Sequence, residues 1–131
     1  RDMANFGLLY LNNGKIGQRQ VVPPDWVKQS TSVRSGMIGT YYSRWDKKYG
    51  YGYLWWIRRS DNDIDIPFAL GHGGQRIVIL PAANSVIVTQ ADPSVDSSNS
   101  HKHHRTIDSL IFGDLSGYLL QQNSLGNSTS R

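Results

Sequence analysis

Apolar side chains at helical spacing predict two helices in the first 30 residues. Three of them mark one face of a helix over the first 13 residues: Met3, Phe6 and Tyr10. Asn13-Gly14 then supplies the left-handed stop that helices favour. The stretch 21–27 contains two prolines and an early aspartate, which predicts extended chain leading into a short second helix that ends near Ser30. The stretch 31–48 has little periodicity, so we expect a long surface connection there.

Alternating and continuous apolar runs predict an antiparallel sheet in the middle of the chain. The segment 49–59 alternates, which predicts one strand with Tyr51, Tyr53, Trp55 and Ile57 on one face. A second strand begins at 68–72, where two glycines interrupt it, and an apolar β-branched run follows at 75–80. The run 85–91 follows a turn at 81–84, so we expect a hairpin whose strands are buried on both faces.

The last part of the chain predicts a helix that covers a sheet face, after a loop at 92–100. Its apolar stripe consists of Ile107, Leu110, Ile111, Leu115, Tyr118 and Leu119. Residues 121–131 are polar and rich in Gly, Ser and Asn, which predicts a flexible tail. The fold class is therefore α/β of the α+β type, with antiparallel strands and packing helices in residues 1–120.

Composition removes several kinds of chemistry. The 131 residues correspond to one ordinary domain or to a piece of a larger one. The chain has no cysteine, which excludes a disulfide scaffold, a thiolate zinc site and a cysteine nucleophile. All ten acidic residues are aspartates, so motifs that need glutamate are absent. We expect neither a cofactor nor a metal.

Charge and hydropathy argue against nucleic acid or a membrane as partners. The net charge is +4, but the basic residues are scattered along the chain, which is typical of a solvated surface. No apolar run approaches the roughly 20 residues needed to span a membrane. The chain begins with Arg1 within an expected helix, so we expect a C-terminal piece of a protein whose targeting signal lies outside it.

The segment Gly71-His72-Gly73-Gly74-Gln75 is the best candidate for chemistry. It joins an acid–base side chain to glycines, which let a backbone come close to a ligand, at the start of a buried strand. At a strand edge there, we expect the backbone N–H of Gln75 to point at a developing oxyanion. The alternative is a glycine-rich β-bulge with a surface histidine.

The order of features resembles the C-terminal part of serine hydrolases of the class C β-lactamase family, which includes penicillin-binding proteins, esterases and 6-aminohexanoate-dimer hydrolases. The matching stretches are RDMANFGLLYLNNGKI, VVPPDWVKQS, YGYGYLWWI, LGHGGQRIVILPAANSVIVTQAD and the closing helix. In that family the strand corresponding to 69–80 carries a Lys-Thr-Gly or His-x-Gly triplet that lines the active site. The resemblance places His72-Gly73-Gly74 at that triplet and makes the Gln75 N–H the second oxyanion-hole donor.

The resemblance also implies that the nucleophile lies outside this chain. The family's Ser-x-x-Lys motif is upstream, and no lysine here has a serine three positions before it. Tyr10-Leu11-Asn12 has the letters of the family's Tyr-x-Asn motif, but Tyr10 belongs to an amphipathic helix and we interpret it as core packing. We therefore expect the chain alone to be inactive and its partner to be the N-terminal part of the same protein, in a periplasmic or secreted enzyme.

The resemblance further implies an acyl-enzyme mechanism on a small ester, amide or lactam. His72 is not the general base. At the triplet it donates a hydrogen bond to the substrate's carboxylate or carbonyl, or holds the tyrosine–lysine network in place. Histidine in place of lysine removes a permanent cation, which favours an esterase, amidase or peptidase over an efficient β-lactamase.

Aromatic residues carry a second hypothesis. Tyr53 and Trp55 are candidates for substrate binding, although packing is the common role of such side chains on a strand. The alternative function is a small non-catalytic module that binds a carbohydrate or an anionic polymer through Trp45, Trp55 and Trp56. A module predicts a stable monomer, whereas a piece of a hydrolase predicts exposed apolar surface and self-association.

Three weaker patterns have simple explanations. His101, His103 and His104 have metal-like spacing, but their basic neighbours favour a solvated helix start. The alternating aspartates at 61–65 lack the glycine and glutamate of a calcium loop. The segment 127–129 fits a glycosylation acceptor, which matters only in a eukaryotic secretory context.

Overall fold

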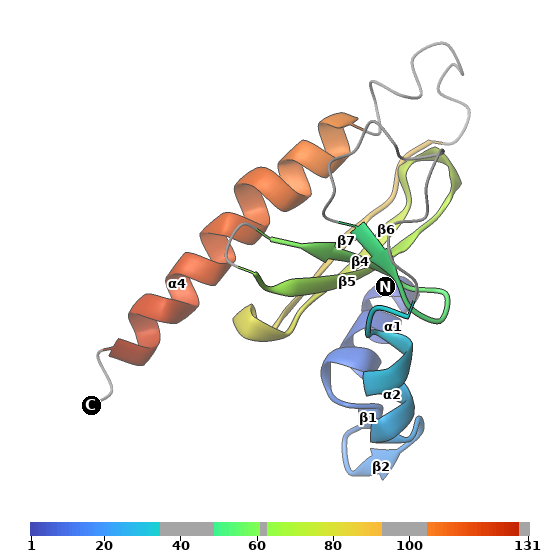
Figure 1. Ribbon diagram of the computed structural model, residues 1–131. Coiled ribbons are helices and arrows are strands. Elements are labelled where there is room, and N and C mark those ends of the chain that lie inside the picture. Colours follow the sequence, from blue (N-terminus) through green and yellow to red (C-terminus); the bar gives the residue numbers. More distant parts are fainter. Residues whose placement is uncertain (35–48, 61–62, 93–104, 129–131) are drawn as a thin grey trace.

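The computed structural model describes residues 1–34, 49–60, 63–92 and 105–128. Its centre is a five-stranded antiparallel sheet in which strands adjacent in sequence are adjacent in space (Figure 1). The strands are β3 (Tyr49–Tyr51), β4 (Trp56–Arg59), β5 (Asp65–Leu70), β6 (Arg76–Leu80) and β7 (Ser85–Thr89). The mixture of helices and an antiparallel sheet confirms the predicted coarse class.

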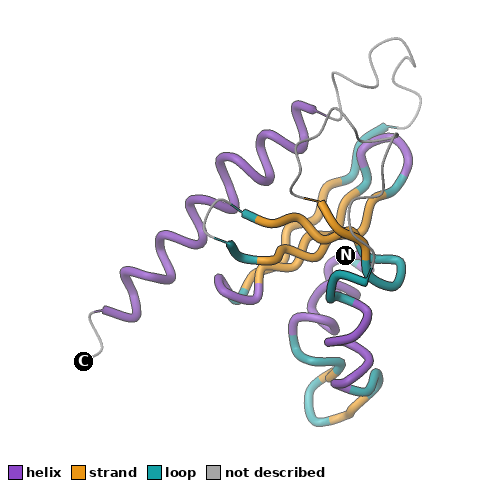
Figure 2. Tube along the Cα trace, in the orientation of Figure 1, coloured by secondary structure: helices purple, strands orange, loops and turns teal. Residues whose placement is uncertain are grey.

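Helical layers cover both faces of this sheet, as the tube view shows (Figure 2). On one side lies α1 (Asp2–Leu11), followed by the short pair β1 (Lys15–Ile16) and β2 (Arg19–Gln20) and by α2 (Pro24–Ser30). On the other side lie η3 (Ser109–Leu115), a π-helical segment, and α4 (Ser116–Ser128). The predicted boundaries of the first two helices are confirmed, while the short β1–β2 pair was not predicted.

Each face of the sheet has its own apolar core. Towards α1, Trp55, Ile57 and Ile79 pack with Tyr10 and Leu11. Towards η3 the core is formed by another set: Ile66, Phe68, Val78, Leu80 and Ile111. Because both faces are covered, every residue of β6 is buried, as the sequence predicts. β7 is only half-buried, since it is an edge strand, so the prediction of full burial is wrong for that strand.

The segment 49–59 forms two strands, so the prediction of one continuous strand is wrong. The chain reverses at 52–55, where the Gly52 N–H donates to the Trp55 carbonyl at 2.8 Å and Leu54 has a positive φ of +64°. A Cβ on Gly52 would lie 2.1 Å from the Ser30 carbonyl oxygen, so only glycine fits beside the end of α2. Tertiary contact with α2 thus overrides the alternating pattern.

The segment 69–80 is also divided, by the turn η1 (His72–Gly74). The predicted interruption at the glycines is therefore confirmed, whereas the single strand that the resemblance implied over 69–80 is not found. The next connection agrees with prediction: η2 (Pro81–Ala83) ends at Asn84, whose φ of +47° closes the β6–β7 hairpin. Its register pairs Leu80 with Ser85 and Arg76 with Thr89.

The C-terminal helix buries only part of the predicted stripe. Ile107, Ile111 and Leu119 pack into the core, whereas Leu110, Leu115 and Tyr118 are exposed and Ser116 is buried instead. The π-helical turns of η3 cause this shift, because they widen the spacing of residues that share a face. The Ser116 hydroxyl donates to the Ile111 carbonyl at 2.6 Å within this segment.

The helix continues to Ser128, where composition predicts an irregular tail from residue 121. The predicted end of the helix was therefore too early. Among the described residues, no helix has the length and apolar character that crossing a membrane would require.

Candidate functional site

The candidate triplet forms the tight turn between β5 and β6. The Gly71 N–H donates to the Gln75 carbonyl at 2.9 Å, which closes the turn at its base. Gly73 and Gly74 have φ values of +72° and +94° inside it. L-residues with side chains rarely adopt such values, so these two positions require glycine. The sequence Gly-His-Gly-Gly-Gln therefore encodes a hairpin turn rather than a stretch of strand.

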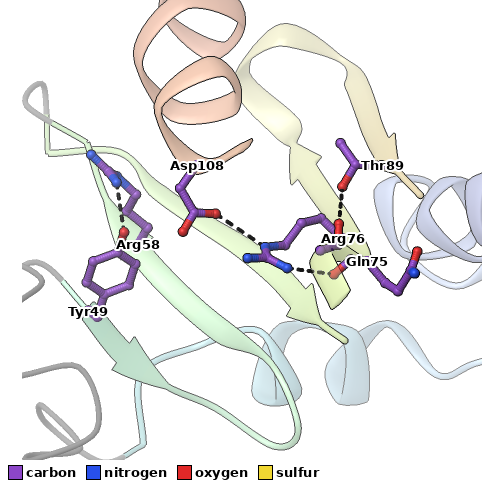
Figure 3. Close-up of polar contacts among 7 residues, drawn as sticks. Tyr49, Arg58, Gln75, Arg76, Thr89 and Asp108 are labelled. Atoms are coloured by element: carbon purple, nitrogen blue, oxygen red, sulfur yellow. Dashed lines mark hydrogen bonds and ion pairs between the residues drawn. The ribbon is translucent and has the colours of Figure 1, made fainter. Parts of the chain in front are cut away.

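Two side-chain contacts tie this turn to β7. The Thr89 hydroxyl donates to the Gly74 carbonyl at 2.8 Å. The Gln75 side-chain amide donates to the Ala91 carbonyl at 2.7 Å and accepts from the Ala91 N–H at 3.4 Å. A primary amide has the donor and acceptor of a peptide group, so Gln75 extends the β6–β7 ladder beyond the last paired residues. Figure 3 shows the Thr89 contact beside Gln75.

A third contact ties the turn to the C-terminal helix. Arg76 Nη1 donates to the Gln75 carbonyl at 3.0 Å, and Arg76 Nε lies 3.3 Å from Asp108 Oδ1 (Figure 3). The Arg76 side chain is fully buried, and Asp108 is nearly so. This arginine corrects the prediction that the basic residues are scattered over a solvated surface.

Burial dominates the electrostatics of Asp108. Loss of hydration raises the pKa of its carboxyl above the usual value, and the charge and hydrogen bond of Arg76 oppose that rise without cancelling it. Asp108 Oδ2 is buried and has no hydrogen-bond partner among the described residues. When Asp108 is ionised, one of its two carboxylate oxygens therefore lacks a hydrogen-bond donor among the described residues.

Tyr49 and Arg58 extend the same polar cluster across β3 and β4. Arg58 Nη1 donates to the Tyr49 hydroxyl at 2.8 Å, and the guanidinium lies 4.8 Å from the centre of the Phe112 ring. Burial raises the pKa of Tyr49, while Arg58 acts in the opposite direction. The cluster therefore lies between the sheet and η3, with two arginines and one aspartate.

The backbone N–H of Gln75 is the predicted oxyanion-hole donor, and its direction follows from the turn. The Gly74–Gln75 peptide is trans, so its N–H points away from the Gly74 carbonyl that Thr89 holds on the β7 side. Gln75 is extended, and its N–H therefore lies on the side of the turn and β5. This N–H donates to none of the described residues.

The remaining predicted site residues occupy different environments. The His72 side chain is exposed at the turn and makes no hydrogen bond or ion pair with any described residue. Tyr53 is 47% exposed and stacks on Trp26, with ring centres 5.4 Å apart. Trp55 is only 3% exposed and packs against Tyr10 at 4.7 Å. The packing alternative therefore holds for Trp55, whose ring is not at the surface.

The tryptophans behind the binding-module hypothesis do not form one exposed surface in the described part of the chain. Trp55 is buried and Trp56 is half-buried against Phe68. Trp45 lies outside the described residues, as do the histidines at 101–104. Within the described ranges, no group of three potential ligands has the arrangement of a metal site. Asp65, from the alternating aspartates, pairs with Arg59 at 2.8 Å instead.

Three residues of the site were missed by sequence reasoning: Arg76, Thr89 and Asp108. Arg76 begins an otherwise apolar strand, and Asp108 lies among the apolar positions of the closing helix. A charge within an apolar pattern is a usable signal, because buried charges are found in pairs. Thr89 carried no signal, since threonine is ordinary in a strand.

Comparison with known proteins leaves the chain without an assigned family. Neither the models of known protein families nor the curated proteins gave a match.

Proposed function

We propose that these residues are the C-terminal part of a serine hydrolase of the class C β-lactamase type, and that the β5–β6 turn is one wall of its active site. The observation that carries the proposal is the N–H of Gln75, which is held in a glycine turn and donates to no described residue. The antiparallel sheet between helical layers is compatible with such a domain.

In the proposed reaction, a serine from an upstream segment attacks the substrate carbonyl after a base removes its proton. The carbonyl oxygen becomes an oxyanion, which accepts a hydrogen bond from the Gln75 N–H and from a donor in the upstream segment. Collapse of the tetrahedral intermediate expels the alcohol or amine with a proton and leaves an acyl-serine. Water then repeats the attack and releases the acid.

His72 is assigned to substrate recognition. Its exposed imidazole lies three residues before the Gln75 N–H, in the same turn. From there it donates a hydrogen bond to a carboxylate or carbonyl of the substrate. Because histidine, unlike lysine, is not a permanent cation, esters, amides and peptides suit this wall better than lactams that need one.

The first test is labelling of the full-length protein with a serine-reactive fluorophosphonate, followed by intact-mass analysis. The full-length protein is expected to gain one label, whereas the 131-residue chain gains none because it contains no activated serine. A full-length protein that never labels would overturn the hydrolase proposal and favour the binding module.

A second measurement examines His72. His72→Ala in the full-length protein is expected to lower kcat/KM roughly 10-fold or more on an activated ester that bears a carboxylate, since a hydrogen bond to a charged group is lost. His72→Gln keeps a donor and should retain more of the rate. Lys15→Ala, at the exposed strand β1 far from the turn, is the control. An unchanged rate in His72→Ala would remove His72 from the site.

A further inference from the structure

The peptide group between Gly74 and Gln75 has little intrinsic reason to keep one orientation. Gly74 has a φ of +94° and no Cβ, so rotation about this peptide meets less steric resistance than in a chain of ordinary residues. Rotation of the group would turn the Gln75 N–H away from its present side of the strand. A donor to an oxyanion must be oriented before the reaction begins. It stabilises the developing charge effectively because the donor does not have to reorient during the reaction.

One contact opposes this rotation directly. The Thr89 hydroxyl donates to the Gly74 carbonyl at 2.8 Å, and that carbonyl belongs to the same planar group as the Gln75 N–H. Gly74 is buried, so its carbonyl cannot exchange Thr89 for water at no cost. A hydrogen bond to the carbonyl also polarises the peptide and strengthens its N–H as a donor.

We propose that Thr89 is a positioning residue, which fixes the Gln75 N–H as an oxyanion donor by holding the Gly74 carbonyl on the β7 side. This inference rests on the proposed function. The other contacts of the turn involve different groups. Arg76 donates a hydrogen bond to the Gln75 carbonyl, and the Gln75 side-chain amide donates to the Ala91 carbonyl. Thr89 alone, among these described contacts, acts on the peptide group that carries the donor.

The test compares variants of Thr89 in the full-length protein. Thr89→Val keeps the shape of the side chain and removes the hydroxyl, and it is expected to lower kcat on an activated ester roughly 10- to 100-fold with KM little changed. Thr89→Ser keeps the hydroxyl and is expected to restore the rate. Ser85→Ala is the matched control, because Ser85 donates its hydroxyl to the Ala83 carbonyl at the opposite end of β7.

A second readout separates orientation from general damage to the fold. A functional oxyanion hole favours an ester over the corresponding thionoester, whose sulfur is a poor hydrogen-bond acceptor. The ester-to-thionoester rate ratio is expected to fall in Thr89→Val and to stay at the wild-type value in Thr89→Ser and Ser85→Ala. A merely structural role would lower both rates together and leave the ratio unchanged.

The possible failures are distinguishable. A wild-type rate and ratio in folded Thr89→Val, with fluorophosphonate labelling intact, would overturn the role of Thr89 and leave the proposed function standing. If Thr89→Val does not fold, loss of activity in folded Thr89→Ser would overturn the role, since the hydroxyl is still present. Absence of labelling in the wild-type protein would overturn the proposed function and this inference with it.

Discussion

Arg76 is a fully buried charge at the start of a strand whose other residues are all apolar. Its guanidinium is satisfied in part by the Gln75 carbonyl and by Asp108, which belongs to the helix on the other side of the core. Such a pair contributes little net stability, but removal of one partner leaves a buried charge and typically costs about 3–5 kcal/mol. The pair therefore fixes how the helix lies on the sheet beside the turn.

Protonation of Asp108 predicts a pH dependence of stability. The pKa of Asp108 in the folded protein is raised by burial, so the folded state binds this proton more tightly than the unfolded state. The resulting stabilisation is complete below the unfolded pKa of about 3.9 and is lost as the pH rises through the folded pKa. A side-chain amide does not ionise in this range, so Asp108→Asn should gain stability relative to wild type as the pH rises above about 4, and then level off.

Urea unfolding of the full-length protein at a series of pH values measures this difference. The groups that act on Asp108 are Arg76 and Arg58, and Tyr49 is also near it. Asp114→Asn is the control, because it removes one negative charge at an exposed position of the same helix. A difference between Asp108→Asn and wild type that stays constant with pH would contradict the raised pKa.

At the scale of elements, α1 lies unusually close to the sheet at Gly7. A Cβ at this position would lie 2.5 Å from Val86 Cγ1 and 3.0 Å from Ile77 Cγ2. Alanine is a better helix former than glycine by about 1 kcal/mol, so local propensity alone favours Gly7→Ala. The close approach makes Gly7→Ala destabilising, because α1 has to move away from β6 and β7 to accept one methyl group.

Two identical substitutions in two helices are therefore expected to have opposite effects. Gly7→Ala should lower the free energy of unfolding by about 1–3 kcal/mol through overpacking. Gly117→Ala, in α4, should raise it by about 0.5–1 kcal/mol, because nothing lies within 4 Å of the added Cβ. Urea midpoints of the two variants check both signs. Stabilisation by Gly7→Ala would show that α1 does not pack as described.

The C-terminal helix shows how an element is rearranged by its packing. Its sequence has a stripe with ordinary helical period, yet η3 buries Ile111 and Ser116 and leaves Leu110 exposed. Asp108, directly before η3, bonds Arg76, and Phe112 within η3 lies against Phe68 with ring centres 5.2 Å apart. This part of the helix therefore departs from regular α-helical periodicity and makes two contacts with the sheet.

On the scale of the whole molecule, two helical layers cover the sheet but leave apolar side chains exposed. On the first layer these are Phe6, Leu8 and Trp26; on the second they are Leu110, Leu115 and Tyr118. Scattered exposed apolar residues are normal on a protein surface. Exposed apolar side chains on both layers are what the proposal requires if further chain packs there in the full-length protein.

This arrangement predicts self-association of the isolated chain. The 131 residues alone are expected to bind a hydrophobic fluorescent dye and to sediment faster than a monomer, whereas the full-length protein should bind less dye for each chain. Sedimentation velocity and dye fluorescence measure the two properties. A monomeric, cooperatively folded chain without dye binding would support the non-catalytic module instead.

Prediction from sequence succeeded where a local rule applied. Asn13-Gly14 ended the first helix, the prolines opened the second, and the turn at Asn84 set the hairpin. It failed in 49–59, where the position of α2 forces a reversal at Gly52, and in the single strand that the resemblance implied over 69–80, which a turn at the glycines divides. These failures have one cause, because alternation of side chains does not show where a strand is interrupted.

The candidate site was only partly accessible from the sequence. The residues Gly71 to Gln75 were found because glycines beside a histidine are a local pattern. Thr89, Arg76 and Asp108 act on that turn from β7, from β6 and from the closing helix, at separations of up to 32 residues. Hydrogen bonds between distant segments have no local signature in a single sequence.

The sequence by itself determined the ends of the first two helices, the antiparallel character of the sheet and the candidate turn, because capping, glycine φ values and alternation are properties of neighbouring residues. Only the tertiary structure decided which side chains meet at the turn and which face of the last helix is buried. Those outcomes depend on burial of a charge and on close approach of elements, and both are set by the packing of segments far apart in the chain.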